Sequence, residues 1–91
     1  MIDRFMLRAC RKGINAKSLA RVQRALARGA DVNSQDVEYG YTCMHYACRG
    51  DTPSHRRLRR LLRAYGARMD IPSHSSTFTA MDLLGIYAGT F

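Results

Sequence analysis

Apolar residues recur along this chain at the three- and four-residue spacing of α-helices, in five short stripes separated by polar segments. The stripes consist of Met6, Leu7 and Cys10; Leu19, Val22, Ala25 and Leu26; Met44, Ala47 and Cys48; Leu58, Leu61, Leu62 and Tyr65; and Met81, Leu83, Leu84 and Tyr87. Gly29 and Gly66 follow the second and fourth stripes, where a left-handed residue often ends a helix. Ser54 is the expected N-cap of the fourth helix. The pattern predicts an all-α chain of short paired helices.

The chain also repeats itself. Ala9-Cys10-Arg11 aligns with Ala47-Cys48-Arg49 at an offset of 38 residues, and Gly29-Ala30 aligns with Gly66-Ala67 at an offset of 37. Thr42 and Thr79 are again 37 residues apart. Because three separate anchors agree to within one residue, the repeating unit is two short helices followed by a polar loop that leads to a threonine.

The stretch GADVNSQDVEYGYTCMHYA at residues 29–47 resembles the ankyrin repeat family, whose pattern has a Gly-Ala-Asp-Val-Asn stretch, a glycine and then Thr-Pro-Leu-His-x-Ala. Here the tetrapeptide reads Thr42-Cys43-Met44-His45, and a degenerate form follows at residues 79–82. Two features depart from the family pattern: the repeats exceed the usual spacing of about 33 residues, and the tetrapeptide lacks proline.

The resemblance implies one all-α domain over residues 1–91, an ankyrin-like solenoid of antiparallel helix pairs joined by extended hairpin-like loops. Repeat 1 would span about residues 3–35, repeat 2 about 36–72 and a half repeat about 73–91. It also implies structural roles for four residues. Thr42 would cap a helix, His45 would join the threonine hydroxyl to the backbone of the adjoining repeat, and Gly29 and Gly66 would end helices.

Cys43 and Cys48 flank His45 in a way that could suggest a metal site. On a helix, however, the two cysteines are about 140° apart around the axis and about 7.5 Å apart along it. Two thiolates on one zinc ion, with bonds of ~2.3 Å, lie within roughly 4 Å of each other. We therefore expect the cysteines to be small buried thiols and expect no metal ligands, no cofactor and no catalytic residues. His55 and His74 are expected to face solvent. A metal or catalytic role for His45 is the alternative.

The charge is strongly positive and unevenly distributed. Fifteen lysines and arginines against seven acids give a net charge of +8. Residues 54–68 hold six arginines and no acid, whereas Asp31, Asp36 and Glu38 gather in a predicted loop. The second helices would carry a basic band of Arg21, Arg24, Arg28, Arg56, Arg57, Arg59, Arg60 and Arg63. The band favours an anionic partner, RNA or an acidic protein surface; an arginine-rich compositional bias is the other reading.

Two further surfaces follow from the resemblance. Partner-binding tips would comprise Val37, Glu38, Tyr39, Tyr41, His74, Phe78, Arg11, Lys12 and Arg49. An open end would comprise Leu83, Leu84, Ile86 and Tyr87, because the third repeat has one helix; alternatively this helix tucks in and caps the stack itself, with Thr90 and Phe91 disordered.

These features predict a non-catalytic protein–protein interaction module, a small basic subunit or adaptor of a larger complex. The alternative is a ribonucleoprotein component, for example a ribosome-associated one, that contacts RNA phosphates through the arginine band. No small-molecule substrate and no membrane partner are expected. Three cysteines, an odd number, favour reduced thiols and an intracellular location in the cytoplasm or nucleus, with the mitochondrion possible because residues 1–13 are arginine-rich and amphipathic.

Overall fold

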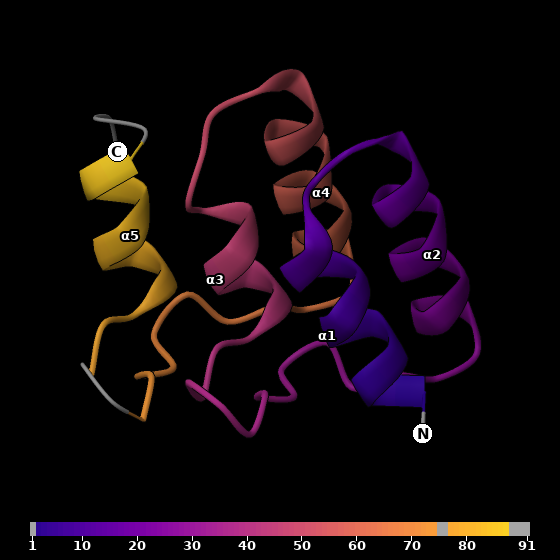
Figure 1. The fold of residues 1–91 in the computed structure, drawn as a ribbon, viewed down its shortest axis with the longest axis horizontal. Coiled ribbons are helices and arrows are strands. Elements are labelled where there is room, and N and C mark those ends of the chain that lie inside the picture. Colours follow the sequence, from indigo (N-terminus) through magenta and orange to yellow (C-terminus); the bar gives the residue numbers. More distant parts are fainter. Residues whose placement is uncertain (1, 75–76, 88–91) are drawn as a thin grey trace.

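The computed structural model describes residues 2–74 and 77–87, and this part of the chain is helical throughout, with no strand. Its five helices are α1 (Ile2–Lys12), α2 (Ala16–Ala27), α3 (Cys43–Ala47), α4 (Pro53–Ala64) and α5 (Ala80–Tyr87). The pairs α1/α2 and α3/α4 stand side by side and α5 follows α3, so the first helices form one layer and the second helices another (Figure 1). The predicted all-α solenoid of helix pairs is confirmed.

Helices α2 to α5 each start at a short polar side chain that accepts a hydrogen bond from the first turn. Asn15 caps α2 and exchanges hydrogen bonds with Ser18, and Thr42 caps α3 as expected. The prediction for α4 was wrong: the cap is Thr52, not Ser54. Pro53 explains the shift, because its fixed φ suits the first helical position and places the cap one residue before it.

Gly29 and Gly66 end α2 and α4 as the pattern predicts. Their φ angles are +96° and +86°, in the left-handed region that glycine adopts without steric cost. Neither would bring a Cβ atom within 4 Å of another residue, so both positions require glycine for backbone conformation and not for space.

The core lies between the two helix layers. Met6 of α1, Val22 of α2, Met44 of α3 and Leu58 of α4 are 0–1% exposed and belong to one continuous cluster, to which α5 contributes Leu83. The three cysteines are also buried in it as small hydrophobic residues. Tyr65, Met81 and Tyr87, which the stripe pattern assigns to the core, are instead 44–50% exposed, because no described helix packs against their side.

The loops before α3 and α5 lie next to each other below the helices (Figure 1), and each contains a matching backbone hydrogen bond. In the first, the Asp36 N–H donates to the Tyr41 carbonyl at 2.8 Å; in the second, the Ser73 N–H donates to the Phe78 carbonyl at 2.9 Å. The His74 N–H then donates to the Tyr39 carbonyl at 2.9 Å and joins the two loops. These hairpin-like turns bring the predicted tips to one edge of the molecule.

Candidate functional site

His45 fastens repeat 2 to the segment that precedes α5. Its side chain is fully buried, and its Nδ1 atom lies 3.0 Å from the backbone nitrogen and 2.9 Å from the hydroxyl oxygen of Thr42. On the other side of the ring, Nε2 lies 2.9 Å from the Phe78 carbonyl oxygen. Because the Thr42 N–H donates to Nδ1, the proton of the neutral ring sits on Nε2 and is donated to Phe78. This is the structural role that the resemblance implied.

The environment of His45 keeps it uncharged. Burial lowers its pKa below the ordinary 6.5, and the hydrogen bond to the Phe78 carbonyl offsets only part of that effect. Both ring nitrogens are occupied by structural partners, so neither is free for a metal ion or for proton transfer.

Asp36 organises the first loop from inside. It is 7% exposed and accepts hydrogen bonds from the backbone N–H groups of Tyr39 and Tyr41 and from the Tyr46 hydroxyl. Burial raises the pKa of its carboxyl, but these hydrogen bonds outweigh burial and the net pKa is lowered. Asp36 is therefore a structural anion, whereas Asp31 and Glu38, the other acids of the predicted loop, are exposed.

The loop tip is tied to the first helices through its aromatic rings. Tyr41 is half-buried and stacks on His45 with ring centroids 5.1 Å apart, and Arg49 lies over its other side at 5.7 Å. Arg11 lies 5.7 Å from the centre of the Tyr39 ring and forms an ion pair of 3.0 Å with Glu38. Tyr41 thus serves mainly as packing, and Tyr39, 45% exposed, is the tyrosine that a partner can reach.

A groove runs between the outer face of α1 and this loop. Its volume is about 520 Å³, and it is lined by Asp3, Arg4, Leu7, Arg8, Arg11, Ser34, Gln35, Asp36, Val37 and Glu38. Val37 is 77% exposed and Leu7 is at the core surface, so the groove offers apolar atoms as well as guanidinium groups.

Three of the predicted tip residues, Arg11, Val37 and Glu38, line this groove together. Lys12, His74 and Phe78 are exposed but lie outside it, with His74 and Phe78 on the second loop. Sequence reasoning missed Arg4 and Arg8. The signal was present, because residues 4, 8 and 11 follow each other at helical spacing on the face of α1 opposite Met6 and Cys10.

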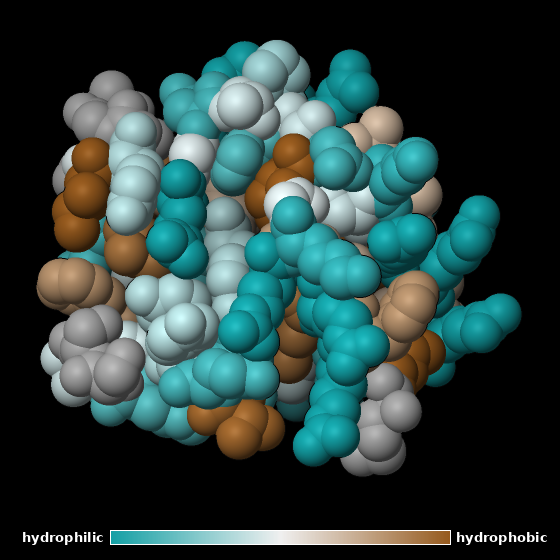
Figure 2. Space-filling view, in the orientation of Figure 1, coloured by the Kyte–Doolittle hydropathy of each residue, from teal (hydrophilic) through white to brown (hydrophobic). Residues whose placement is uncertain are grey.

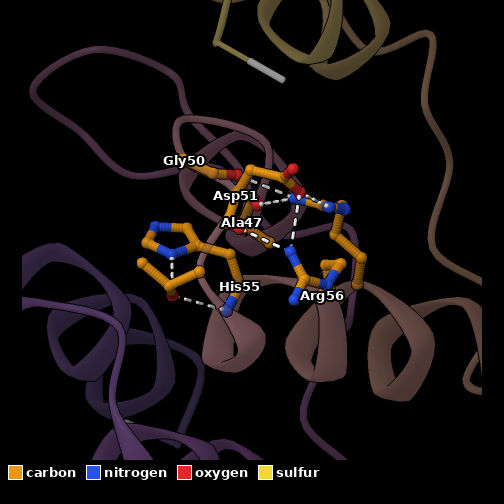
Figure 3. Close-up of polar contacts among 7 residues, drawn as sticks. Ala47, Gly50, Asp51, His55 and Arg56 are labelled. Carbon is orange, nitrogen blue, oxygen red and sulfur yellow. Dashed lines mark hydrogen bonds and ion pairs between the residues drawn. The ribbon is translucent and has the colours of Figure 1, made fainter. Parts of the chain in front are cut away.

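The basic band is smaller than the sequence indicated. Arg59 is only 15% exposed: it donates to the carbonyl oxygens of Ala47 and Gly50, both at 2.9 Å, and pairs with Asp51 at 2.8 Å. Asp51 also pairs with Arg56 at 3.6 Å (Figure 3). Counting acids only within residues 54–68 overlooked Asp51, which follows α3 and supplies the missing anion.

His55 lies at the same junction and faces solvent only in part. Its ring is half-buried against Gly50, and its Nδ1 atom lies 2.7 Å from the Thr52 hydroxyl oxygen (Figure 3). Thr52-Pro53-Ser54-His55 therefore forms the same kind of cap on α4 that Thr42 and His45 form on α3.

The remaining six arginines of the band are exposed and form no ion pair within residues 2–74 and 77–87. They fall into two groups. Arg21, Arg24 and Arg28 lie on α2, and Arg57, Arg60 and Arg63 lie on α4. The two groups lie on neighbouring helices, since α2 packs on α4.

The open end is partly closed. Leu83 is 3% exposed and belongs to the core, and Leu84 is half-buried, so the prediction that both are bare was wrong. They are covered because α5 packs on α3. Ile86 and Tyr87 are exposed at 59% and 50%. The expectation for Thr90 and Phe91 lies outside the described residues.

The thiols offer no metal-binding geometry. Within residues 2–74 and 77–87, no three histidine, cysteine or acidic side chains gather closely enough to hold an ion. Cys43 faces Cys10, and contact with that thiol followed by burial raises the pKa of Cys43; burial raises the pKa of Cys48 to about 11. The raised pKa values make the Cys43 and Cys48 thiols less acidic than an exposed cysteine, and all three thiols are buried away from solvent.

Comparison with known families agrees with this geometry. The family described as ankyrin repeats (many copies) matches residues 6–62, more than half of the chain. The chain belongs to the ankyrin repeat family. Ankyrin repeats generally mediate protein–protein interactions and are typically non-catalytic. A search of curated proteins finds no match to the chain. None of the helices in the described part of this ankyrin-repeat chain has the length and apolarity needed to cross a bilayer.

Proposed function

We propose that this ankyrin-repeat chain is a basic adaptor or subunit that binds a protein partner in the groove between α1 and the first loop. The observation that carries the proposal is the composition of that groove, in which Arg4 and Arg8 lie opposite the exposed Val37. A partner segment with acidic residues would pair with the arginines and place an apolar side chain on Val37 and Leu7.

The groove is held in shape before any partner arrives. Asp36 fixes the backbone of the loop, and the Arg11–Glu38 ion pair joins the loop to the end of α1. A surface that is already ordered loses less conformational entropy on binding, which favours affinity. The exposed Ile86 and Tyr87 would add a second apolar contact where the partner is large enough to reach α5. Three buried free thiols support an intracellular location as part of this proposal.

The alternative is an RNA contact through the arginine band. Two of the eight arginines, Arg56 and Arg59, already pair with Asp51, which reduces the charge available for phosphates. This internal pairing favours the protein partner, since phosphate binding strengthens with each cation that is free to contact it.

Native affinity purification of the tagged chain, with and without nuclease, tests the proposal. The Arg4→Glu/Arg8→Glu variant should lose the co-purifying protein, whereas the matched Arg57→Glu/Arg60→Glu variant, with the same change in charge on α4, should retain it. Circular dichroism establishes that both variants are folded. Loss of the partner on nuclease treatment, or selective loss with the α4 variant, would refute the groove and support the RNA contact.

A further inference from the structure

A second surface, separate from the groove, lies on the outer side of α2. Lys17, Arg21, Arg24 and Arg28 follow each other at intervals of four, three and four residues, and all are exposed. At ~100° per residue these intervals keep the four side chains within an arc of about 60°, along a line of ~16.5 Å. They form one straight basic stripe and no ion pair within the described residues.

The stripe borders an apolar hollow. A cavity of about 210 Å³ is lined by Ile2 and Phe5 of α1 and by Arg21, Arg24, Ala25 and Arg28 of α2. Phe5 is 53% exposed, although it lies one residue before the fully buried Met6. In Figure 2 hydrophobic atoms on the side of α1 and α2 are bordered by projecting hydrophilic side chains. Cations around an exposed aromatic ring form the kind of centre that dominates binding energy at protein interfaces.

The packing of α2 on its inner side indicates which kind of element would fit on its outer side. Within the described residues α2 contacts only α1 and α4, and it stands at the edge of the stack with its outer side uncovered (Figure 1). A helix placed on the outer side would continue the side-by-side packing that α2 already has with α4. Its own side chains would recur at the same intervals of three and four residues, so acids on one face could meet the stripe in register.

Charge decides between a second copy of this chain and a different partner. The end of the stack opposite α2 carries α5, which contains a single acid, Asp82 (Figure 1). Stacking one copy on the next would therefore set one acid against the four cations of the stripe, and stacking α2 on α2 would set the stripe against itself. Like charges across an interface oppose association and one acid does not match four cations, so the complement is an acidic surface of a different protein.

We propose that the stripe on α2, with the Phe5 hollow, is a docking site for an amphipathic acidic α-helix of another protein. Glutamates or aspartates at intervals of three and four residues would pair with Arg21, Arg24 and Arg28, and one apolar side chain would fill the hollow against Phe5. A nucleic acid backbone would meet the cations but would leave Phe5 and Ile2 against phosphate. This proposal does not depend on the groove between α1 and the first loop.

Fluorescence anisotropy with three labelled probes tests it at about 0.15 M ionic strength. The first probe is a helical peptide of about 20 residues with glutamates at intervals of four and three around one leucine. The second has the same composition with the intervals scrambled, and the third is single-stranded oligouridine. The receptors are the full chain, Arg21→Gln/Arg24→Gln, Phe5→Ala and the control Arg57→Gln/Arg60→Gln, each verified as folded by circular dichroism.

The ordered peptide should bind at least about fivefold more tightly than the scrambled one, and the α2 variant should weaken it by roughly tenfold. The α4 control should change binding by less than about twofold, and Phe5→Ala should weaken it severalfold. Equal losses with the α2 and α4 variants, or equal binding of the ordered and scrambled peptides, would overturn the proposal. Tighter binding of oligouridine that only the α2 variant abolishes would overturn it in favour of a single-stranded nucleic acid.

Discussion

The His45 ring joins two repeats through one hydrogen bond: its Nε2 atom lies 2.9 Å from the carbonyl oxygen of Phe78, 33 residues further along the chain. The same ring holds the start of α3 through Thr42. The bonds to Thr42 are buried, so the Thr42 N–H could not turn to water instead, whereas the bond to Phe78 is part-buried.

Replacement of His45 by alanine should therefore lower the free energy of unfolding by about 2–4 kcal/mol, from the unsatisfied Thr42 N–H, the lost bond to Phe78 and the cavity that is left. Against a total of about 5–14 kcal/mol for a chain of this length, the loss is large. Urea denaturation followed by circular dichroism measures it. His55→Ala is the matched control, since His55 caps α4 in the same way nearer the surface and should cost about 1 kcal/mol or less. Equal losses of unfolding free energy in the two variants would mean that the burial of His45 contributes nothing to stability.

Protonation of His45 should destabilise the fold in mild acid. Its folded pKa is below the ordinary 6.5, so the unfolded chain binds the proton more readily. Stability is fully present above pH 6.5 and falls as the pH drops from there toward the folded pKa. The lowered pKa of Asp36 affects stability only at lower pH, because the stability it contributes is lost as the pH falls below the ordinary 3.8.

Urea denaturation between pH 4.5 and 8 should show this decline in the native chain. The His45→Asn variant should flatten the curve, whereas His55→Asn should leave most of it in place, since burial lowers the pKa of His55 as well but its ring lies nearer solvent. A native curve that is flat from pH 8 to 5 would contradict the neutral, buried imidazole.

The close contact between the two loops predicts a difference between two glycines with similar backbone angles. Gly40 has a φ of +72°, and a Cβ atom there would lie 2.6 Å from the backbone nitrogen of His74. Gly66→Ala has room for its Cβ and should cost about 1 kcal/mol from conformation alone. Gly40→Ala should cost about 1–3 kcal/mol more, because the loops must separate. Thermal unfolding of both variants measures the difference, and equal midpoints would show that the loops do not pack as described.

Arg59 should behave as a structural residue and its neighbours on α4 should not. Lysine cannot reach two carbonyls and a carboxylate at once, so Arg59→Lys should lower the free energy of unfolding by about 1–2 kcal/mol. Arg60→Lys, on the exposed side, should change it by less than about 0.5 kcal/mol. Chemical denaturation of the two variants side by side is the measurement. Similar losses of unfolding free energy would show that Arg59 is an exposed arginine with no structural role.

The helix pairs could be predicted from sequence because their signals are local. Apolar spacing, Gly29, Gly66 and the Thr42–His45 cap each act within a few residues, and the offset of 37 residues relates one unit to the next. The partners of Arg59 and His55 could not be predicted in this way, since both depend on how the chain turns between α3 and α4. For Leu83 the pattern identified the residue as apolar, but only the packing of α5 on α3 shows that it is buried.

One of the two walls of the groove could be predicted from the sequence. Its loop wall was predicted as a binding tip, including Val37 and Glu38. Its helix wall of Arg4 and Arg8 was not, because a basic face on a helix indicates only exposure until the loop that lies opposite is placed. The pairing of Arg56 and Arg59, which makes the arginine band smaller, likewise depends on where Asp51 lies in space.

Site-specific photo-crosslinking tests the central claim, that a protein partner binds in the groove, most directly. A benzophenone side chain is placed at Val37, which is 77% exposed on the groove wall, or at Arg63, which is exposed on α4. The account predicts a nuclease-resistant protein adduct from position 37, lost in the Arg4→Glu/Arg8→Glu background, and none from position 63. An adduct formed only from position 63, or one from position 37 that survives the Arg4→Glu/Arg8→Glu change, would contradict it.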